Sequence, residues 1–182
     1  MKQVFAEVGS SFQQVGGTCP DGWVVMQSER PTPEHVAQAD GSWTLDPSLK
    51  LTKNNTAYSA ATMALTADYP QLEKDTWPTQ NEEASAWVAD PAGASTPWID
   101  RAAAERGIER EEYIRRTLIK ARQFKVISAF LTGRRQRYED QIKAGNDPVL
   151  DYALTRELLA ELQAITETIM STPAAGLQEA LA

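Results

Sequence analysis

The chain of 182 residues has little of several residue types on which common binding and catalytic sites depend. Its single cysteine, Cys19, cannot form an intramolecular disulfide or a thiolate cage for zinc. Its single histidine, His35, excludes sites that need two or three imidazole ligands. The sequence has neither a P-loop nor a dinucleotide-binding glycine fingerprint. We therefore expect no metal, no cofactor and no catalytic residue, and we predict that the protein is not an enzyme.

Long apolar runs are also missing. No stretch approaches the ~18 consecutive apolar residues that a membrane-spanning helix requires. The first residues include an acid, Glu7, and lack the apolar core of a signal peptide. We expect a cytoplasmic protein that makes no contact with a membrane.

The net charge of −7 is distributed unevenly along the chain. Residues 1–100 hold 5 Lys/Arg and 13 Asp/Glu, residues 101–143 hold 12 and 6, and residues 144–182 hold 1 and 6. The basic segment could dock against the acidic parts of its own chain, for example Glu157 and Glu161, or it could bind nucleic acid. We favour internal docking because the whole chain is acidic. The competing nucleic-acid face would be formed by Arg115, Arg116, Arg122, Arg134, Arg135 and Arg137.

The first fifty residues predict a small β-rich unit. Apolar and β-branched residues at 4–8, 23–26 and 42–45 are typical of short strands, and glycine-containing turns separate them. The proline-rich stretch 31–36 predicts only a brief helical turn. A unit of two to four short strands is marginally stable alone, so we expect it to dock on the helices or on a partner.

The remainder of the chain predicts helices. We expect helices at 55–67, at 71–89 with a kink at Pro78, and at 97–106 with Thr96 as N-cap. Gly107 follows the third of these as a suitable C-terminal stop. A long amphipathic helix should follow at 109–144, where apolar residues recur with a period of 3.6 and Gly133 could loosen the helix.

The last predicted helix begins after Asp147 as N-cap and ends at Pro173. The sequence thus predicts an α+β fold with a β-rich unit at 1–50, a helical domain at 54–172 containing a long antiparallel helix pair, and a weakly structured tail at 173–182. Part of the last helix has the heptad spacing of a coiled coil, which could allow a homo-oligomer through Leu158, Leu162, Ile165 and Ile169.

All five tryptophans precede residue 100. Tryptophan serves as an anchor both in cores and at protein interfaces. We assign Trp77, Trp87 and Trp98 to the core. For Trp23 and Trp43 a core position and an interface position are equally favoured, because a small β-rich unit has little interior.

Most of the chain carries a pattern of helix caps, helix stops and aromatic residues. Its upstream part comprises Cys19-Pro20, Gly22-Trp23, Met26, Arg30-Pro31 and Asp40-Gly41-Ser42-Trp43. Its helical part comprises Tyr69-Pro70, Glu73, Thr76-Trp77, Gln80, Glu83-Ala84, Ala86-Trp87, Asp90, Thr96-Pro97, Ile99-Asp100, Arg106-Gly107-Ile108, Lys120-Ala121, Phe124, Gly133-Arg134-Arg135-Gln136 and Glu139-Asp140. This pattern resembles the tail-fibre assembly proteins of tailed bacteriophages and R-type pyocin-like particles.

The resemblance implies a non-enzymatic chaperone in the host cytoplasm. Its partner would be the C-terminal region of a trimeric tail-fibre protein, whose folding and trimerisation it would assist. One alternative is a structural component retained in the phage tail or baseplate, and a second is a nucleic-acid-binding regulator. Strand edges and exposed aromatic residues of the β-rich unit could contact the fibre. We predict partner contacts at Val4, Phe5, Phe12, Trp23, Val25 and Trp43.

Overall fold

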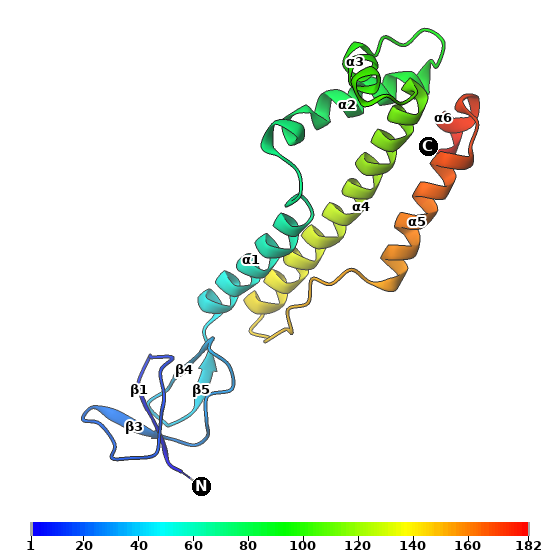
Figure 1. The fold of residues 1–182 in the computed structure, drawn as a ribbon. Helices are drawn as coiled ribbons and strands as arrows, with labels where there is room; N and C mark the ends of the chain where they lie inside the picture. Colours follow the sequence, from blue (N-terminus) through cyan, green and yellow to red (C-terminus); the bar gives the residue numbers. More distant parts are fainter. Residues whose placement is uncertain (1, 182) are drawn as a thin grey trace. The chain divides into compact units, whose positions relative to one another are not determined.

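The computed structural model describes residues 2–181 and confirms the predicted α+β fold (Figure 1). Short strands come first and helices follow. The strands are β1 (Val4–Glu7), β2 (Gln14–Val15), β3 (Trp23–Met26), β4 (His35–Ala37) and β5 (Trp43–Leu45). The helices are α1 (Pro47–Ala64), α2 (Gln71–Ala89), α3 (Pro97–Arg106), α4 (Arg110–Lys143), α5 (Arg156–Ser171) and α6 (Leu177–Ala180), with a 3₁₀ turn at Ala174–Gly176 before α6.

The chain divides into two compact units. Of the described residues, unit 1 comprises 2–60 and Gly133–Asp151, and unit 2 comprises Ala61–Thr132 and 152–181. Both α1 and α4 contribute residues to each unit. None of the helices formed by residues 2–181 has the length and apolarity that a transmembrane span needs.

Unit 1 contains two antiparallel sheets. One has the strand order β2-β1-β3, and the other is the hairpin β4-β5. Because paired residues point to the same face of a sheet, the register Val4↔Met26 and Ala6↔Val24 places these side chains together. They form a core with Ala37 of β4, against which Trp43 of β5 packs.

The helical turn predicted at 31–36 is present only as a single turn at 32–35, and β4 begins at its last residue, His35. The backbone turns at Thr32, whose carbonyl accepts a hydrogen bond from the His35 N–H at 3.1 Å, and then extends to pair with β5. Pairing with residues 43–45 determines the extended conformation of residues 35–37.

The helix α1 begins eight residues before the predicted start at residue 55. The Asp46 carboxylate accepts hydrogen bonds from the Ser48 N–H at 2.8 Å and from the Ser48 hydroxyl at 2.6 Å, and Pro47 occupies the first helical position. Within unit 1, the fully buried Asn54 donates from its amide to the Arg135 carbonyl at 3.1 Å. This contact ties α1 to the last turns of α4.

The helix α5 begins at Arg156, so the predicted N-cap at Asp147 is wrong. The Thr155 hydroxyl instead accepts the hydrogen bond from the Leu158 N–H at 3.2 Å. Asp147 forms an ion pair with Lys50 of α1 at 2.5 Å, a contact within unit 1. The connection from α4 to α5 is therefore an extended segment rather than a short turn (Figure 1).

The core of unit 2 gathers residues from several helices. α2 contributes Ala84 and Trp87, α3 contributes Ile99, α4 contributes Ile114 and Leu118, α5 contributes Ile169 and α6 contributes Leu177. The predicted bounds of α2 and α3 are confirmed. α2 remains helical through Pro78. α4 likewise continues through Gly133, which lies inside the helix without breaking it.

Part of the predicted oligomerisation seam of α5 is buried within the protein itself. Leu158 is buried and Ile169 is fully buried, and Ile165 packs against the core cluster of unit 2. The Gln123 amide of α4 donates to the Leu162 carbonyl at 3.0 Å, which fixes α5 alongside α4. Leu162 and Ile165 are half-buried, so a homo-oligomer through this seam stays a prediction.

Candidate partner-binding surface

Four large apolar side chains of unit 1 remain exposed around the three-stranded sheet. Phe12 is 75% exposed, Val25 54%, Val8 48% and Val15 43%. Val25 lies on β3, Val15 on β2, and Val8 and Phe12 lie in the loop that joins β1 to β2. We call these four the exposed apolar residues of the sheet. Sequence reasoning selected Phe12 and Val25 and missed Val8 and Val15.

The structure corrects two of the predicted partner contacts. Val4 is 5% exposed and Phe5 is 2% exposed, so neither side chain can reach a partner from the folded unit. The register places Val4 on the core face of the sheet, beside Met26. Apolar character alone could not tell these buried residues from Val8, which lies just beyond the end of β1.

Trp23 and Trp43 are half-buried. Trp43 packs against the core of unit 1, and its indole N–H donates to the Ser28 carbonyl at 3.0 Å. The indole N–H is therefore already hydrogen-bonded within the chain, so Trp43 has a structural role. Trp23 is paired with Glu7 at the end of β3.

The loop that carries Phe12 is held on both sides by hydrogen bonds. The Gly9 N–H donates to the Ala37 carbonyl at 2.8 Å, and the Ala37 N–H donates to the Ser10 carbonyl at 3.0 Å. On the other side, the Arg30 N–H donates to the Gln13 side chain at 2.7 Å, and the Arg30 guanidinium donates to the Ser11 carbonyl. Phe12 is therefore exposed on an anchored loop, so little order would have to be gained on binding.

The outer edge of β3 is partly covered by the chain itself. The Gln27 N–H donates to the Gly41 carbonyl at 2.9 Å. Gly41 lies so close that a Cβ atom there would be 2.6 Å from the Val25 carbonyl oxygen. An incoming strand therefore meets Gly41 at this edge. The exposed apolar residues of the sheet are the more accessible feature.

Three ionisable groups of unit 1, those of His35, Cys19 and Glu34, have local partners. The His35 Nδ1 lies 2.9 Å from the Thr32 hydroxyl, and the Cys19 thiol donates to the carbonyls of Pro20 and Trp23 at 3.6 Å. Burial raises the pKa of Glu34, but hydrogen bonds from Lys53 and Thr32 outweigh it and hold the pKa below 4.5. Within residues 2–181, no group of three or more His, Cys, Asp or Glu side chains is arranged to hold a metal ion.

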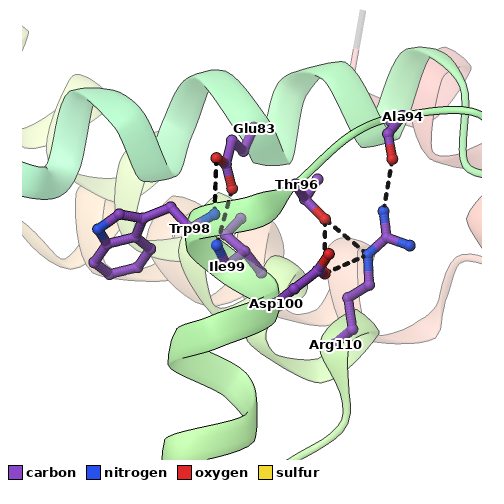
Figure 2. A network of polar contacts seen from close by, with 7 residues as sticks. All are labelled: Glu83, Ala94, Thr96, Trp98, Ile99, Asp100 and Arg110. Atoms are coloured by element: carbon purple, nitrogen blue, oxygen red, sulfur yellow. Dashed lines mark hydrogen bonds and ion pairs between the residues drawn. The ribbon is translucent and has the colours of Figure 1, made fainter.

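Several residues of the pattern at 83–110 form one polar network in unit 2 (Figure 2). The Glu83 carboxylate of α2 accepts the N–H groups of Trp98 at 3.1 Å and Ile99 at 2.9 Å. These are two of the donors that the first turn of α3 leaves without intrahelical partners. Thr96 stands at the predicted N-cap, yet its side chain accepts no capping bond, because Glu83 fills that role.

Arg110 closes the other side of this network. Its Nε donates to the Thr96 hydroxyl at 2.8 Å and lies 3.1 Å from the Asp100 carboxylate, while its Nη2 donates to the Ala94 carbonyl at 2.9 Å (Figure 2). The Thr96 hydroxyl in turn donates to Asp100 at 2.9 Å. This network, which includes several residues of the pattern, therefore connects α2, α3 and the start of α4. Its role is to hold the helical scaffold together.

The comparison with known families gives one match. Residues 119–166 are similar to the family described as the HI1402 helical domain. No curated protein and no solved structure matches the chain. The matched segment is about a quarter of the chain and runs from within α4 to within α5. Its description names neither a partner nor an activity.

The matched segment contains contacts that hold the α4–α5 connection in place. The Tyr138 hydroxyl of α4 donates to the Asp151 carbonyl at 3.0 Å, and Arg134 donates to the same carbonyl at 2.8 Å. The Gln123 amide also lies within the segment and donates to the Thr166 hydroxyl at 3.0 Å. The similarity thus covers residues with clear roles in the helical scaffold.

The arginines of the predicted nucleic-acid face contact their own chain. Within residues 2–181, no ion pair joins them to Glu157 or Glu161, so that predicted pairing is wrong. Arg115 instead donates to the carbonyls of Ile169 and Thr172 at the end of α5. Each arginine of the predicted face contacts a carboxylate, a carbonyl or an aromatic ring of its own chain; the six are Arg115, Arg116, Arg122, Arg134, Arg135 and Arg137.

Proposed function

We propose that the chain is a non-enzymatic tail-fibre assembly protein that binds the C-terminal region of a fibre polypeptide through its N-terminal sheet. The observation that carries this proposal is the exposure of Phe12, Val8, Val15 and Val25 around one small sheet. The register pairs Val15 with Val4 and Val25 with Phe5, so Val15 and Val25 point to opposite faces of the sheet. Exposed apolar side chains on a small unit offer another polypeptide apolar surface to cover. The pattern that resembles tail-fibre assembly proteins supplies the identity of the partner.

Partner binding of this kind suits a chain that folds slowly into a trimer. Large β-rich polypeptides expose apolar surface and strand edges while they fold, and these make them prone to aggregate. Covering that surface with the exposed apolar residues of the sheet would keep the fibre soluble until its subunits associate. Phe12 and Val25 would make the main contacts, because they are the most exposed of the four.

The size of the surface favours a reversible complex. Full burial of one large apolar side chain contributes about 1.5–3 kcal/mol, and association itself costs several kcal/mol. Two to four such side chains therefore give weak to moderate affinity. A protein that must leave the finished fibre needs an affinity in this range, whereas a permanent tail or baseplate component needs a larger interface.

The covered edge of β3 argues against strand addition as the main mode of binding. Gly41 occupies the space beside the Val25 carbonyl, so a fibre strand would have to displace it. The contacts of the arginines on α4 likewise argue against the nucleic-acid alternative. Phosphate binding would have to compete with carbonyl and carboxylate acceptors of the same chain.

The proposal is tested by co-expressing the chain with a tail-fibre gene, which in the family that the chain resembles lies beside the gene of the assembly protein. We expect the two proteins to co-purify, and a fibre lacking its C-terminal region to lose the interaction. A protein inventory of purified particles separates the assembly role from the structural alternative. We expect the chain to be absent from mature particles or present far below the fibre. A fixed stoichiometric amount in particles would contradict the assembly role.

A further inference from the structure

Unit 2 contains a cleft that the proposed function does not use. It lies between α2 and α4, has a volume of about 710 Å³, and is open to solvent. Binding sites for small ligands and peptide side chains typically have volumes of about 300–1,000 Å³. The cleft is therefore large enough to receive one or two side chains of another molecule together with their backbone.

One wall of the cleft is apolar and aromatic. The rings of Tyr69 and Trp77 meet edge to face with centroids 5.2 Å apart, and the rings of Trp77 and Phe124 meet in the same way at 6.1 Å. Leu65 and Ile127 extend this wall at its ends. Phe124 remains 46% exposed, so its ring offers apolar surface that the chain itself does not cover.

Cations surround the aromatic wall. Lys74, Arg106, Arg116 and Lys120 all line the cleft, while Glu73 is the only acid among its described lining residues. Within residues 2–181, no carboxylate lies within 4.0 Å of the charged groups of Lys74, Arg106 or Lys120. The Lys120 ammonium lies 4.8 Å above the Tyr69 ring, so this cation is positioned directly at the aromatic wall.

Neutral donors complete the lining. Asn81 of α2 and Tyr113 of α4 both face the cleft. Burial raises the pKa of the Tyr113 phenol, Glu73 raises it further and Arg106 opposes both, with the net effect upward. The Tyr113 hydroxyl therefore stays protonated at neutral pH and can donate a hydrogen bond to a carbonyl or a carboxylate.

We propose that this cleft binds an acidic peptide segment that carries a large apolar side chain. The apolar side chain would pack on Trp77 and Phe124, and neighbouring Asp or Glu side chains would pair with Lys74, Arg106 and Lys120. The charges are complementary, since these three cations form no ion pair with a carboxylate of the described residues, although the chain has a net charge of −7. The proposal does not depend on the partner being a tail fibre.

A peptide fits this cleft better than a nucleic acid does. Nucleobases need an accessible ring face on which to stack, whereas the interplanar angles here are 81° for Tyr69–Trp77 and 61° for Trp77–Phe124. Tilted rings form a pocket for a compact side chain instead of a platform.

The test begins with selection from a displayed library of random dodecapeptides on the full-length chain. The Lys120→Glu/Phe124→Ala variant serves for counter-selection. We expect enrichment of peptides in which at least two acids flank an aromatic or large aliphatic residue. Enrichment of basic peptides, or of peptides that bind the variant equally well, would overturn the proposal.

The affinity of one enriched peptide then measures the role of individual side chains. Lys120→Glu should weaken binding by about tenfold, since it replaces a charge-assisted contact with a repulsion. Lys125→Glu is the matched control, because Lys125 is an exposed lysine of the same helix that does not line the cleft. It should change affinity less than twofold. Equal effects of the two substitutions, or tighter binding of a thymidine oligonucleotide than of the peptide, would contradict an acidic-peptide site.

Discussion

Gly41 occupies a position where both the backbone conformation and the available space exclude a side chain. Its φ of +82° lies in the left-handed region, and a Cβ atom would be 2.6 Å from the Val25 carbonyl oxygen. Gly41→Ala should therefore lower the free energy of unfolding by at least about 2 kcal/mol, measured by urea denaturation. Both the strain and the clash contribute to this loss.

Gly22→Ala provides the matched control for that substitution. Gly22 has the same φ of +82°, but no atom lies within 4 Å of a Cβ built on it. Its replacement should cost only the conformational strain, about 1 kcal/mol. Equal losses in the two variants would show that Gly41 does not approach β3 as closely as described.

Glu34 links the stability of unit 1 to pH. Its buried carboxylate accepts hydrogen bonds from the Lys53 ammonium at 2.9 and 3.0 Å, and its pKa is held below 4.5. Because the folded pKa is the lower one, the contact stabilises the protein at neutral pH. This contribution is lost as the pH falls below 4.5 through the folded pKa.

Glu34→Gln should accordingly reduce stability at pH 7 by about 1 kcal/mol, since Lys53 is half-exposed and the pair is partly screened. The difference between wild type and variant should shrink as the pH is lowered from 6 to 3. Urea unfolding at several pH values measures this difference. A gap that stays constant over that range would mean that Glu34 does not titrate as described.

Gly133 provides a test at the scale of a single helix. It lies inside α4, is exposed, and has open space where a Cβ atom would lie, since beyond its chain neighbours and the backbone of its own helix no atom is within 4 Å. Glycine within a helix costs ~0.5–1 kcal/mol relative to alanine. Gly133→Ala should therefore raise the free energy of unfolding by about that amount, measured by urea denaturation.

Ala129→Gly is the reciprocal control in the same helix. Ala129 is exposed and lies one turn before Gly133, so its replacement should lower the free energy of unfolding by a similar amount. Destabilisation by Gly133→Ala would contradict the prediction and would indicate that the glycine has a role in bending α4.

The elements that sequence reasoning predicted correctly are those whose starts and stops are marked by residues at their own ends. α3 follows Thr96-Pro97 and ends at Gly107, whose φ of +69° is the left-handed conformation expected of a helix stop. α2 likewise begins after Pro70 and matches its predicted bounds. Such local signals need no knowledge of distant contacts.

The elements that were predicted wrongly depend on contacts between distant residues. Asp147 looked like a helix cap, but Lys50 binds it from nearly a hundred residues away. Glu83 caps α3 from the neighbouring helix, which no pattern within 96–100 could indicate. The start of α1 is different, because Asp46-Pro47-Ser48 is a local cap that sequence reasoning missed.

At the scale of the whole molecule, the sequence indicated which region carries the candidate surface, but it did not indicate all of the residues that are exposed there. The α+β fold and an apolar N-terminal unit were predicted, and Phe12 and Val25 are exposed there. Val4 and Phe5 were chosen wrongly, because both faces of β1 are covered: these two adjacent residues point to opposite faces and both are buried. Such coverage depends on residues distant in the chain, as with Met26 and Ala37 in the core that contains Val4, and no local pattern indicates it.

The central claim is that the exposed apolar residues of the sheet assist the folding of a fibre polypeptide. The most direct measurement is the yield of soluble trimeric fibre when its gene is co-expressed with wild type or with the Phe12→Ser/Val25→Ser variant. Both side chains are exposed, so the substitutions should change the free energy of unfolding by no more than about 0.5 kcal/mol each. Val149→Ser/Leu159→Ser is the control, since both residues are exposed and lie outside the sheet.

We predict that the sheet variant lowers the yield of trimer severalfold, toward the level of fibre expressed alone, while the control variant supports the wild-type yield. A sheet variant that supports as much soluble trimer as wild type would contradict the account.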